Sequence, residues 1–152
     1  MMSENTGTVK LHRVIKASPE KLFKAFTDPV AIASWLPPYG FVCSVQHMEA
    51  ALGGKYQMTF HNFTTGSSHS FSGRYTQLAP AKTIQMIESF DSPMLPGEMT
   101  TTIQLKPVSC GTDIHIVQSG IPAMIPTEMC YLGWQESLDK LMRLVEPVIP
   151  DA

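Results

Sequence analysis

Residues 127–146 read TEMCYLGWQESLDKLMRLVE and have the pattern of one long amphipathic helix. Apolar residues recur along this stretch at intervals of three or four, which places them on one face of a helix. The residues of this face are Tyr131, Trp134, Leu138, Leu141 and Val145. Thr127 is expected to cap the start of the helix, and Pro147 to end it, because proline disfavours helical geometry at the residue before it. So wide an apolar stripe needs an apolar surface to pack on.

The polar residues of the same stretch fall largely on the other side of the helix. Glu136 stands four residues before Lys140, and Asp139 stands four residues before Arg143. This order, acidic residue first, favours ion pairs along the surface of a helix. Two such pairs are therefore expected on the outer face.

Composition limits the classes of protein that the chain can represent. A length of 152 residues with 43% hydrophobic content predicts one domain with a real core. A net charge of −2 gives no electrostatic reason to expect nucleic acid or an anionic membrane as a partner. No apolar run approaches the roughly 18 residues of a membrane span, and the first ten residues lack the apolar core of a signal peptide. Three widely spaced cysteines, Cys43, Cys110 and Cys130, favour free thiols in a reducing cytoplasm.

The first third of the chain predicts one strand and two short helices. Residues 9–16 alternate as a half-buried strand, although Arg13 interrupts the apolar side. A helix opens at Ser18-Pro19-Glu20 and ends at Asp28-Pro29, because serine caps helices and proline suits their first position. A second helix covers residues 30–35. We expect a flexible N-terminus over residues 1–8, one domain over 9–147 and a tail over 148–152.

From Phe41 onward the pattern changes from helix to strand. Six segments have strand length and are separated by turn sequences rich in glycine and proline. These segments are 41–50, 55–63, 69–78, 82–90, 98–106 and 112–119. Apolar and polar residues alternate within them, as in an antiparallel sheet that is covered on one face. The predicted class is α+β, with a strongly curved antiparallel sheet wrapped around the long terminal helix.

An ordered set of short motifs resembles one known family over about residues 9–146. The motifs are Ala17-Ser18-Pro19 with Phe23 and Phe26, Asp28-Pro29, Trp35, Gly53-Gly54-Lys55-Tyr56, Phe71-Ser72-Gly73, Gly111-Thr112, Ser119-Gly120, and Gly133-Trp134 with Leu138 and Leu141. They resemble the START-like, or SRPBCC, superfamily that includes the birch-pollen allergen, and within it the Aha-type family related to the activator of heat-shock-protein ATPase. The resemblance implies a helix-grip fold with an apolar cavity between the concave sheet and the long helix. This fold hosts lipid carriers, cyclases, hydrolases and co-chaperones, so it leaves the function open.

The alternation of the strands agrees with a cavity and proposes residues for its wall. Apolar candidates are Trp35, Met58, Phe60, Met86, Phe90 and Ile103, with Met129, Leu132 and Leu138 from the helix. Three polar residues, Glu88, Thr101 and Gln118, share the inward parity. A ligand site needs such convergent polar groups as well as apolar walls. The alternative is that the apolar residues simply fill a core, and that Trp35 anchors the short helix rather than closing the cavity.

Glu88 is the one candidate for a catalytic role. A carboxylate that faces an apolar cavity resists ionisation, so its pKa rises and its neutral form suits a general acid or a hydrogen-bond donor. The alternative is that Glu88 turns into solvent or pairs with Arg74. Gln118 stands where similar sequences often place a histidine, which excludes imidazole chemistry there but leaves an amide to orient a ligand.

The remaining reactive side chains predict no metal site and no cofactor. The five histidines lie on separate segments, without the spacing of a zinc helix. The cysteines form no CxxC pair and have no evident basic activator. Trp134, next to Gly133, is expected to pack the helix closely against the sheet, with lining of the cavity as the alternative.

Three functions follow from these predictions. The first is a binding protein for a small hydrophobic or amphipathic molecule. The second is a cyclase- or hydrolase-type enzyme that uses Glu88 as acid or base. The third, implied by the resemblance, is a stress-related co-chaperone. A homodimer and contact with a chaperone stay open as partners.

Overall fold

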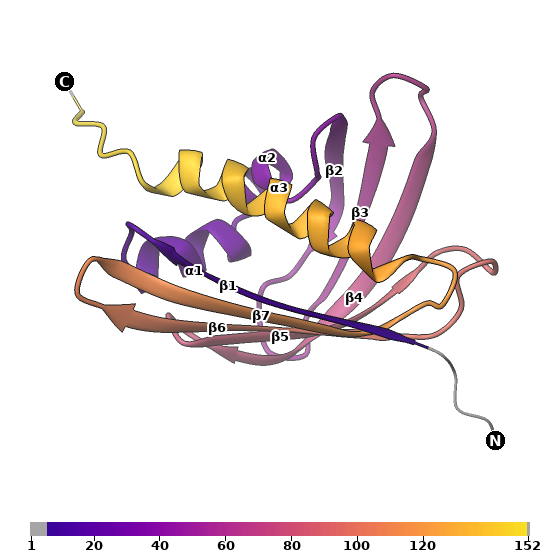
Figure 1. The fold of residues 1–152 in the computed structure, drawn as a ribbon, viewed down its shortest axis with the longest axis horizontal. Helices are drawn as coiled ribbons and strands as arrows, with labels where there is room; N and C mark the ends of the chain where they lie inside the picture. Colours follow the sequence, from indigo (N-terminus) through magenta and orange to yellow (C-terminus); the bar gives the residue numbers. More distant parts are fainter. Residues whose placement is uncertain (1–5, 152) are drawn as a thin grey trace.

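The computed structural model describes residues 6–151, and the chain forms one seven-stranded antiparallel sheet with three helices (Figure 1). The strands are β1 (Gly7–Ile15), β2 (Phe41–Met48), β3 (Lys55–Asn62), β4 (Ser68–Ala79), β5 (Thr83–Phe90), β6 (Met99–Val108) and β7 (Gly111–Ile121). The helices are α1 (Pro19–Thr27), α2 (Pro29–Trp35) and α3 (Thr127–Val145). The strand order is β1-β7-β6-β5-β4-β3-β2, so the first and last strands of the sequence are neighbours. The predicted helix-grip fold is confirmed.

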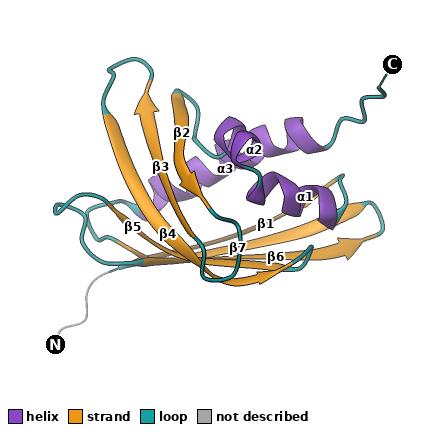
Figure 2. Ribbon diagram, turned by 180° about the vertical axis from the view of Figure 1, so that it is seen from behind, coloured by secondary structure: helices purple, strands orange, loops and turns teal. Residues whose placement is uncertain are grey.

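The sheet bends strongly and holds α3 on its concave side. Strands β2, β3 and β4 rise away from the layer formed by β1, β7, β6 and β5, while α1 and α2 lie beside the C-terminal half of α3 (Figures 1 and 2). Register shifts occur between Val45 and His47 on β2 and between Tyr75 and Gln77 on β4. An extra residue of this kind bends and twists a strand locally, which helps the sheet to curl around the helix.

The caps of the short helices follow the sequence, whereas the cap of the long helix does not. The Ser18 hydroxyl accepts the backbone N–H of Lys21 at 3.2 Å. The Asp28 carboxylate accepts two backbone N–H groups at the start of α2, at 2.9 and 3.0 Å. Pro126 occupies the N-cap of α3 and makes no side-chain cap bond, and the Thr127 hydroxyl donates to Glu128 instead. The prediction of Thr127 as the cap is therefore wrong by one residue.

The apolar stripe of α3 is fully buried only over the C-terminal half of the helix. Leu138, Leu141 and Val145 are buried in the main core, together with the buried residues of α1 and α2. In the first half of α3, Cys130 and Trp134 are partly buried and pack on a small second core formed by Val9, Met99 and Ile121 of the sheet. Tyr131 is 41% exposed, so the first half of the helix is less completely buried than the second.

The polar residues of α3 bind other elements rather than one another. Arg13 lies on the inner side of β1, and its guanidinium donates to Asp139 at 2.8 Å and to the side chain of Gln135. Lys140 donates to the carbonyl of Pro37 at 2.8 Å. The expected ion pairs within the helix are absent among the described residues, because Arg13 and the α2–β2 loop supply these partners. Arg13 thus interrupts the apolar side of β1 in order to hold the helix.

The first strand begins two residues earlier than predicted. β1 begins at Gly7, so Gly7 and Thr8 belong to the strand rather than to the N-terminal segment. The first five residues of that segment lie outside the described residues. Val148 and Ile149, in the predicted tail, are 90% and 82% exposed. Within residues 6–151, no helix combines the length and the apolar character needed to cross a membrane.

Candidate functional site

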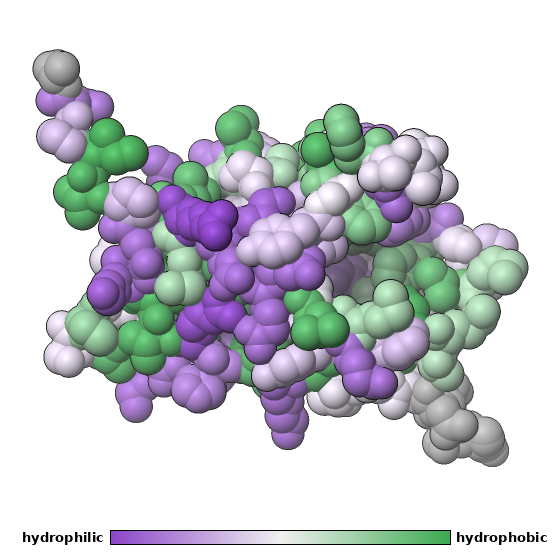
Figure 3. Space-filling model, turned by 45° about the horizontal axis from the view of Figure 1, so that its top comes forward, coloured by the Kyte–Doolittle hydropathy of each residue, from purple (hydrophilic) through white to green (hydrophobic). Residues whose placement is uncertain are grey.

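A pocket of about 280 Å³ lies between the first half of α3 and the concave face of the sheet. Strands β3 to β7, both short helices, the loop before α3 and α3 itself contribute to its wall. The space-filling view shows the surface hollowed in the half of the molecule away from the C-terminal tail (Figure 3). The pocket therefore lies under the less completely buried half of α3, where Cys130 and Trp134 contact the sheet and also line the pocket.

Eight of the twelve predicted site residues line this pocket. They are Met58, Phe60, Met86, Glu88, Phe90, Thr101, Gln118 and Met129. All but Met129 come from strands, where alternation places every second side chain on the inner face. Met129 lines the pocket although it is 66% exposed, so it lies at the mouth rather than in the interior.

The other four predicted residues do not line the pocket. Trp35 is fully buried between α1 and α2, where its indole N–H donates to the carbonyl of Ala25 at 2.9 Å. Ile103 and Leu138 are buried in the core beneath the packed half of α3. Leu132 is 59% exposed, because it stands two positions before Trp134 and therefore points to nearly the opposite side of the helix. Trp35 therefore anchors the short helix, which is the alternative given for it above.

Glu88 faces the pocket rather than solvent or Arg74. Arg74 instead lies 3.5 Å from Glu98, on the outer side. The hydroxyl of Tyr56 donates a hydrogen bond to the Glu88 carboxyl. Tyr56 and Glu88 come from β3 and β5, and both pair in register with Gly73 on the strand between them.

Gly73 allows the tyrosine to cross the intervening strand. A Cβ atom at this position would overlap the phenol of Tyr56 and would lie 2.9 Å from the Cβ of Glu88. The absence of a side chain on β4 therefore opens the path along which the Tyr56 hydroxyl reaches the carboxyl. Neither Tyr56 nor Gly73 is among the predicted site residues, although both belong to the motifs that carry the family resemblance.

A chain of hydrogen bonds leads from α3 towards the same end of the pocket. The indole N–H of Trp134 donates to the Gln118 side-chain oxygen at 3.1 Å. The amide of Gln118 donates to the Thr101 hydroxyl at 3.0 Å, and Thr101 lines the pocket together with Glu88. No buried side-chain nitrogen or oxygen among the described residues lacks a partner. The network fixes the orientation of each polar group at this end of the pocket.

Burial raises the pKa of Glu88 above its ordinary value of 4.5. The hydrogen bonds from Tyr56 and Thr101 favour the ionised form and offset part of this rise. Burial, and then the Glu88 charge, raise the pKa of Tyr75, on the pocket wall, to about 12. The carboxyl thus keeps its proton to a higher pH than an exposed glutamate does, and as a neutral group it can donate a hydrogen bond into the pocket.

The lining carries no fixed positive charge. Its described residues include no lysine or arginine, and His69 is its one imidazole. His69 is exposed and lies against the rings of Phe41 and Phe60, at centroid distances of 5.8 and 6.5 Å. The pocket therefore offers apolar surface and one largely neutral polar end, without a partner for an anion.

Gly133 borders the pocket from α3. A Cβ atom at Gly133 would meet nothing within 4 Å, so the glycine faces open space rather than a close helix–sheet crossing. Trp134 packs against buried residues of the sheet, as predicted, and it also lines the pocket, which is the alternative given for it above. Because glycine in a helix costs about 1 kcal/mol relative to alanine, the residue weakens α3 without improving its packing.

Fold and pocket together place the chain among helix-grip proteins that hold an apolar space beneath the terminal helix. The chain belongs to the family described as Activator of Hsp90 ATPase homolog 1-like protein, whose model matches residues 16–146. The predicted family is thereby confirmed. None of the curated proteins compared with the chain matches it.

Solved structures support the same assignment. A protein from Chromobacterium violaceum is 54% identical, with a TM-score of 0.92, and the match covers 93% of this chain and 98% of that chain. A protein from Rhodobacter sphaeroides matches at 22% identity with a TM-score of 0.81, over 90% of both chains. An AHSA1-like protein from Aeromonas hydrophila matches at 18% identity with a TM-score of 0.75, over 92% of both chains. The last two likenesses show the fold alone.

Proposed function

We propose that this protein binds a small, mostly apolar and uncharged molecule in the pocket beneath α3. The observation that carries the proposal is the buried carboxyl of Glu88 at the end of an apolar space. The Tyr56 hydroxyl holds this carboxyl in place, so its remaining hydrogen-bonding capacity faces the pocket. A ligand with one carbonyl or hydroxyl oxygen and an apolar body matches both features.

The charge of the pocket argues for a neutral ligand. A bound carboxylate would lose its hydration and would lie near Glu88 without a lysine or arginine to pair with. The desolvation of one unpaired ion costs several kcal/mol in a real protein. Fatty acids and similar anions are therefore poor candidates, and alcohols, ketones and esters are better ones.

The size of the pocket and Gly133 support a small ligand. A volume of about 280 Å³ is at the lower edge of the range of about 300–1,000 Å³ for small-molecule sites. A glycine that faces open space inside a helix has no packing benefit, but it keeps this volume free. Filling this position should then block binding.

The experiment compares two probes of equal length on the full chain. Isothermal titration at pH 8 with n-octanol should show binding, and octanoate should bind at least tenfold more weakly. The variant Gly133→Leu tests whether octanol binds in this pocket. It should lose octanol binding, and circular dichroism should show that it remains folded. Equal binding of both probes would overturn the neutral-ligand proposal, and octanol binding unaffected by Gly133→Leu would place the ligand elsewhere.

A second candidate is an enzyme of the cyclase or hydrolase kind with Glu88 as general acid. The raised pKa of Glu88 favours it, because a neutral carboxyl can pass a proton to a bound carbonyl oxygen. An activated nucleophile is missing among the described lining residues: burial raises the pKa of Cys130, and the Ser137 hydroxyl donates to the Leu36 carbonyl at 2.6 Å. A pH–rate profile that is unchanged in Glu88→Gln would remove this candidate.

A third candidate, suggested by the description of the family, is contact with an Hsp90-class ATPase. Apolar side chains around the start of α3 supply a surface for it: Met124, Met129 and Leu132 are 67%, 66% and 59% exposed. Purified chain that neither binds such an ATPase nor changes its rate of hydrolysis would remove the candidate.

A further inference from the structure

Three side chains with metal-binding atoms meet on the convex face of the sheet, opposite the pocket. His12 on β1 pairs directly with His115 on β7 in the strand register. Asp113 precedes His115 by two residues and therefore points to the same face. The Asp113 carboxylate lies 3.2 Å from Nδ1 of His12 and 3.0 Å from Nε2 of His115.

The geometry of the three groups matches the neighbouring ligands of one ion. The two imidazole rings stack with centroids 5.0 Å apart and an angle of 12° between their planes. One ligand atom from each residue lies within 4.8 Å of the others. Around an ion with bonds of about 2.0–2.2 Å, neighbouring ligand atoms stand roughly 2.9–3.5 Å apart. Both N···O distances fall in this range, although they run to different oxygens of the Asp113 carboxylate. A metal ion lies in the plane of each imidazole that binds it, so the two exposed rings rotate out of their stack to share one ion.

We propose that His12, Asp113 and His115 form a binding site for a divalent transition-metal ion of the zinc class. Imidazole nitrogen together with a carboxylate oxygen suits this class of ion rather than calcium or magnesium. The site has three protein ligands, so its remaining coordination positions are open to water. It lies on the face of the sheet away from Glu88 and does not depend on the proposed ligand pocket.

The strands around the site order its three side chains, whereas protons and a nearby positive charge limit its affinity for a metal ion. All three residues stand on paired strands rather than on loops, and without an ion Asp113 already holds both rings by hydrogen bonds. Protons compete with the ion for both imidazoles, so binding weakens as the pH falls. Lys106 pairs with Asp113 in the register of β6 and β7, and its positive charge at this border opposes a cation.

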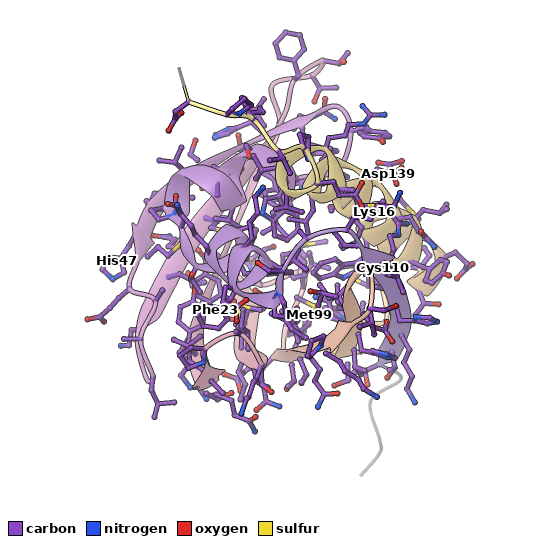
Figure 4. The ribbon with its side chains drawn as sticks, turned by 90° about the vertical axis from the view of Figure 1, so that its left-hand side faces the viewer. Lys16, Phe23, His47, Met99, Cys110 and Asp139 are labelled. Carbon is purple, nitrogen blue, oxygen red and sulfur yellow. The ribbon has the colours of Figure 1, made fainter. Side chains whose placement is uncertain are left out.

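The test is isothermal titration of the full chain with zinc chloride at neutral pH. The protein carries Cys110→Ser, because the exposed Cys110 thiol could bind zinc by itself. We expect one equivalent to bind, with affinity at least tenfold weaker in His12→Gln, in His115→Gln and in Asp113→Asn. His47→Gln is the control and should bind as the parent does, because His47 is exposed on β2, the other edge strand (Figure 4).

Imidazole signals in nitrogen–proton correlation spectra give a second readout. Zinc should shift the ring signals that disappear in His12→Gln and His115→Gln, and no others. Absence of stoichiometric binding to the Cys110→Ser protein would overturn the proposal. Binding that survives both histidine changes, or that falls equally in His47→Gln, would also overturn it. Circular dichroism checks that each variant is folded, which is expected because the His12 and His115 side chains are 64% and 49% exposed.

Discussion

Glu88 is an ionisable residue in an apolar space, and its surroundings determine whether its carboxyl is protonated or ionised. Tyr56 and Thr101 stabilise the ionised carboxylate, whereas burial opposes it more strongly. The folded protein therefore binds the Glu88 proton more tightly than the unfolded chain does. The bound proton stabilises the folded state. This stabilisation is fully present at pH values below the ordinary pKa of 4.5, and it is lost as the pH rises through the pKa of Glu88 in the folded protein.

Glu88→Gln should remove this dependence on pH. Glutamine imitates the neutral carboxyl and can still accept the hydrogen bonds from Tyr56 and Thr101. The free energy of unfolding of the variant, relative to the parent, should rise with pH above 4.5, by at most about 1.4 kcal/mol per pH unit. Urea unfolding at a series of pH values measures it, with Glu98→Gln, an exposed carboxylate, as the matched control. Parallel curves for parent and Glu88→Gln would show that Glu88 titrates alike in both states.

Helix α3 has two halves with different tasks. Its C-terminal half packs on the core through Leu138, Leu141 and Val145, and its N-terminal half covers the pocket with Gly133 and Trp134. This division explains why the apolar stripe predicts the helix correctly but not the burial of each residue in it. It also separates a change that affects the pocket from one that affects the core.

Gly133→Leu should block the pocket and strengthen the helix at once. Leucine has a higher helix propensity than glycine by roughly 0.8 kcal/mol, and its side chain enters open space. We expect equal or higher stability in urea unfolding, together with loss of octanol binding. A loss of more than about 1 kcal/mol would mean that the space beneath Gly133 is occupied in solution.

Arg13 joins β1 to α3 and should matter more than a surface charge. Its side chain is 22% exposed, and its guanidinium binds both Asp139 and Gln135. Arg13→Ala should lower the free energy of unfolding by about 1–2 kcal/mol, discounted because the Asp139 carboxylate is half exposed. Arg13→Lys should recover only part of this loss, because lysine lacks the planar fork.

The control for this prediction is Arg143→Ala. Arg143 is exposed on the same helix and forms no ion pair within the part of the chain that the structure describes. A surface change of this kind usually stays within about 0.5 kcal/mol. Equal losses for Arg13→Ala and Arg143→Ala would contradict the joining role of Arg13.

For the molecule as a unit, the sequence predicts the fold well because the apolar residues of each helix or strand recur at the spacing typical of that element. Alternation sets the inner face of each strand, and it places Met58, Glu88 and Thr101 on the pocket wall. Contacts between strands depend on register, which a single sequence does not encode locally. The Tyr56–Glu88 bond across Gly73 and the meeting of His12 with His115 were therefore out of reach. The prediction that Leu132 lines the pocket is wrong, because an apolar residue in the helical stretch does not have to lie on the inner face of the helix.

The pocket exists only if individual residues, helix α3 and the curved sheet all leave the same space free. A crystal structure of the full chain with bromine-labelled octanol tests this most directly. We expect anomalous bromine density between α3 and the sheet, with the hydroxyl within hydrogen-bonding distance of Glu88. Side chains filling that space, or bromine bound only elsewhere on the protein, would contradict it.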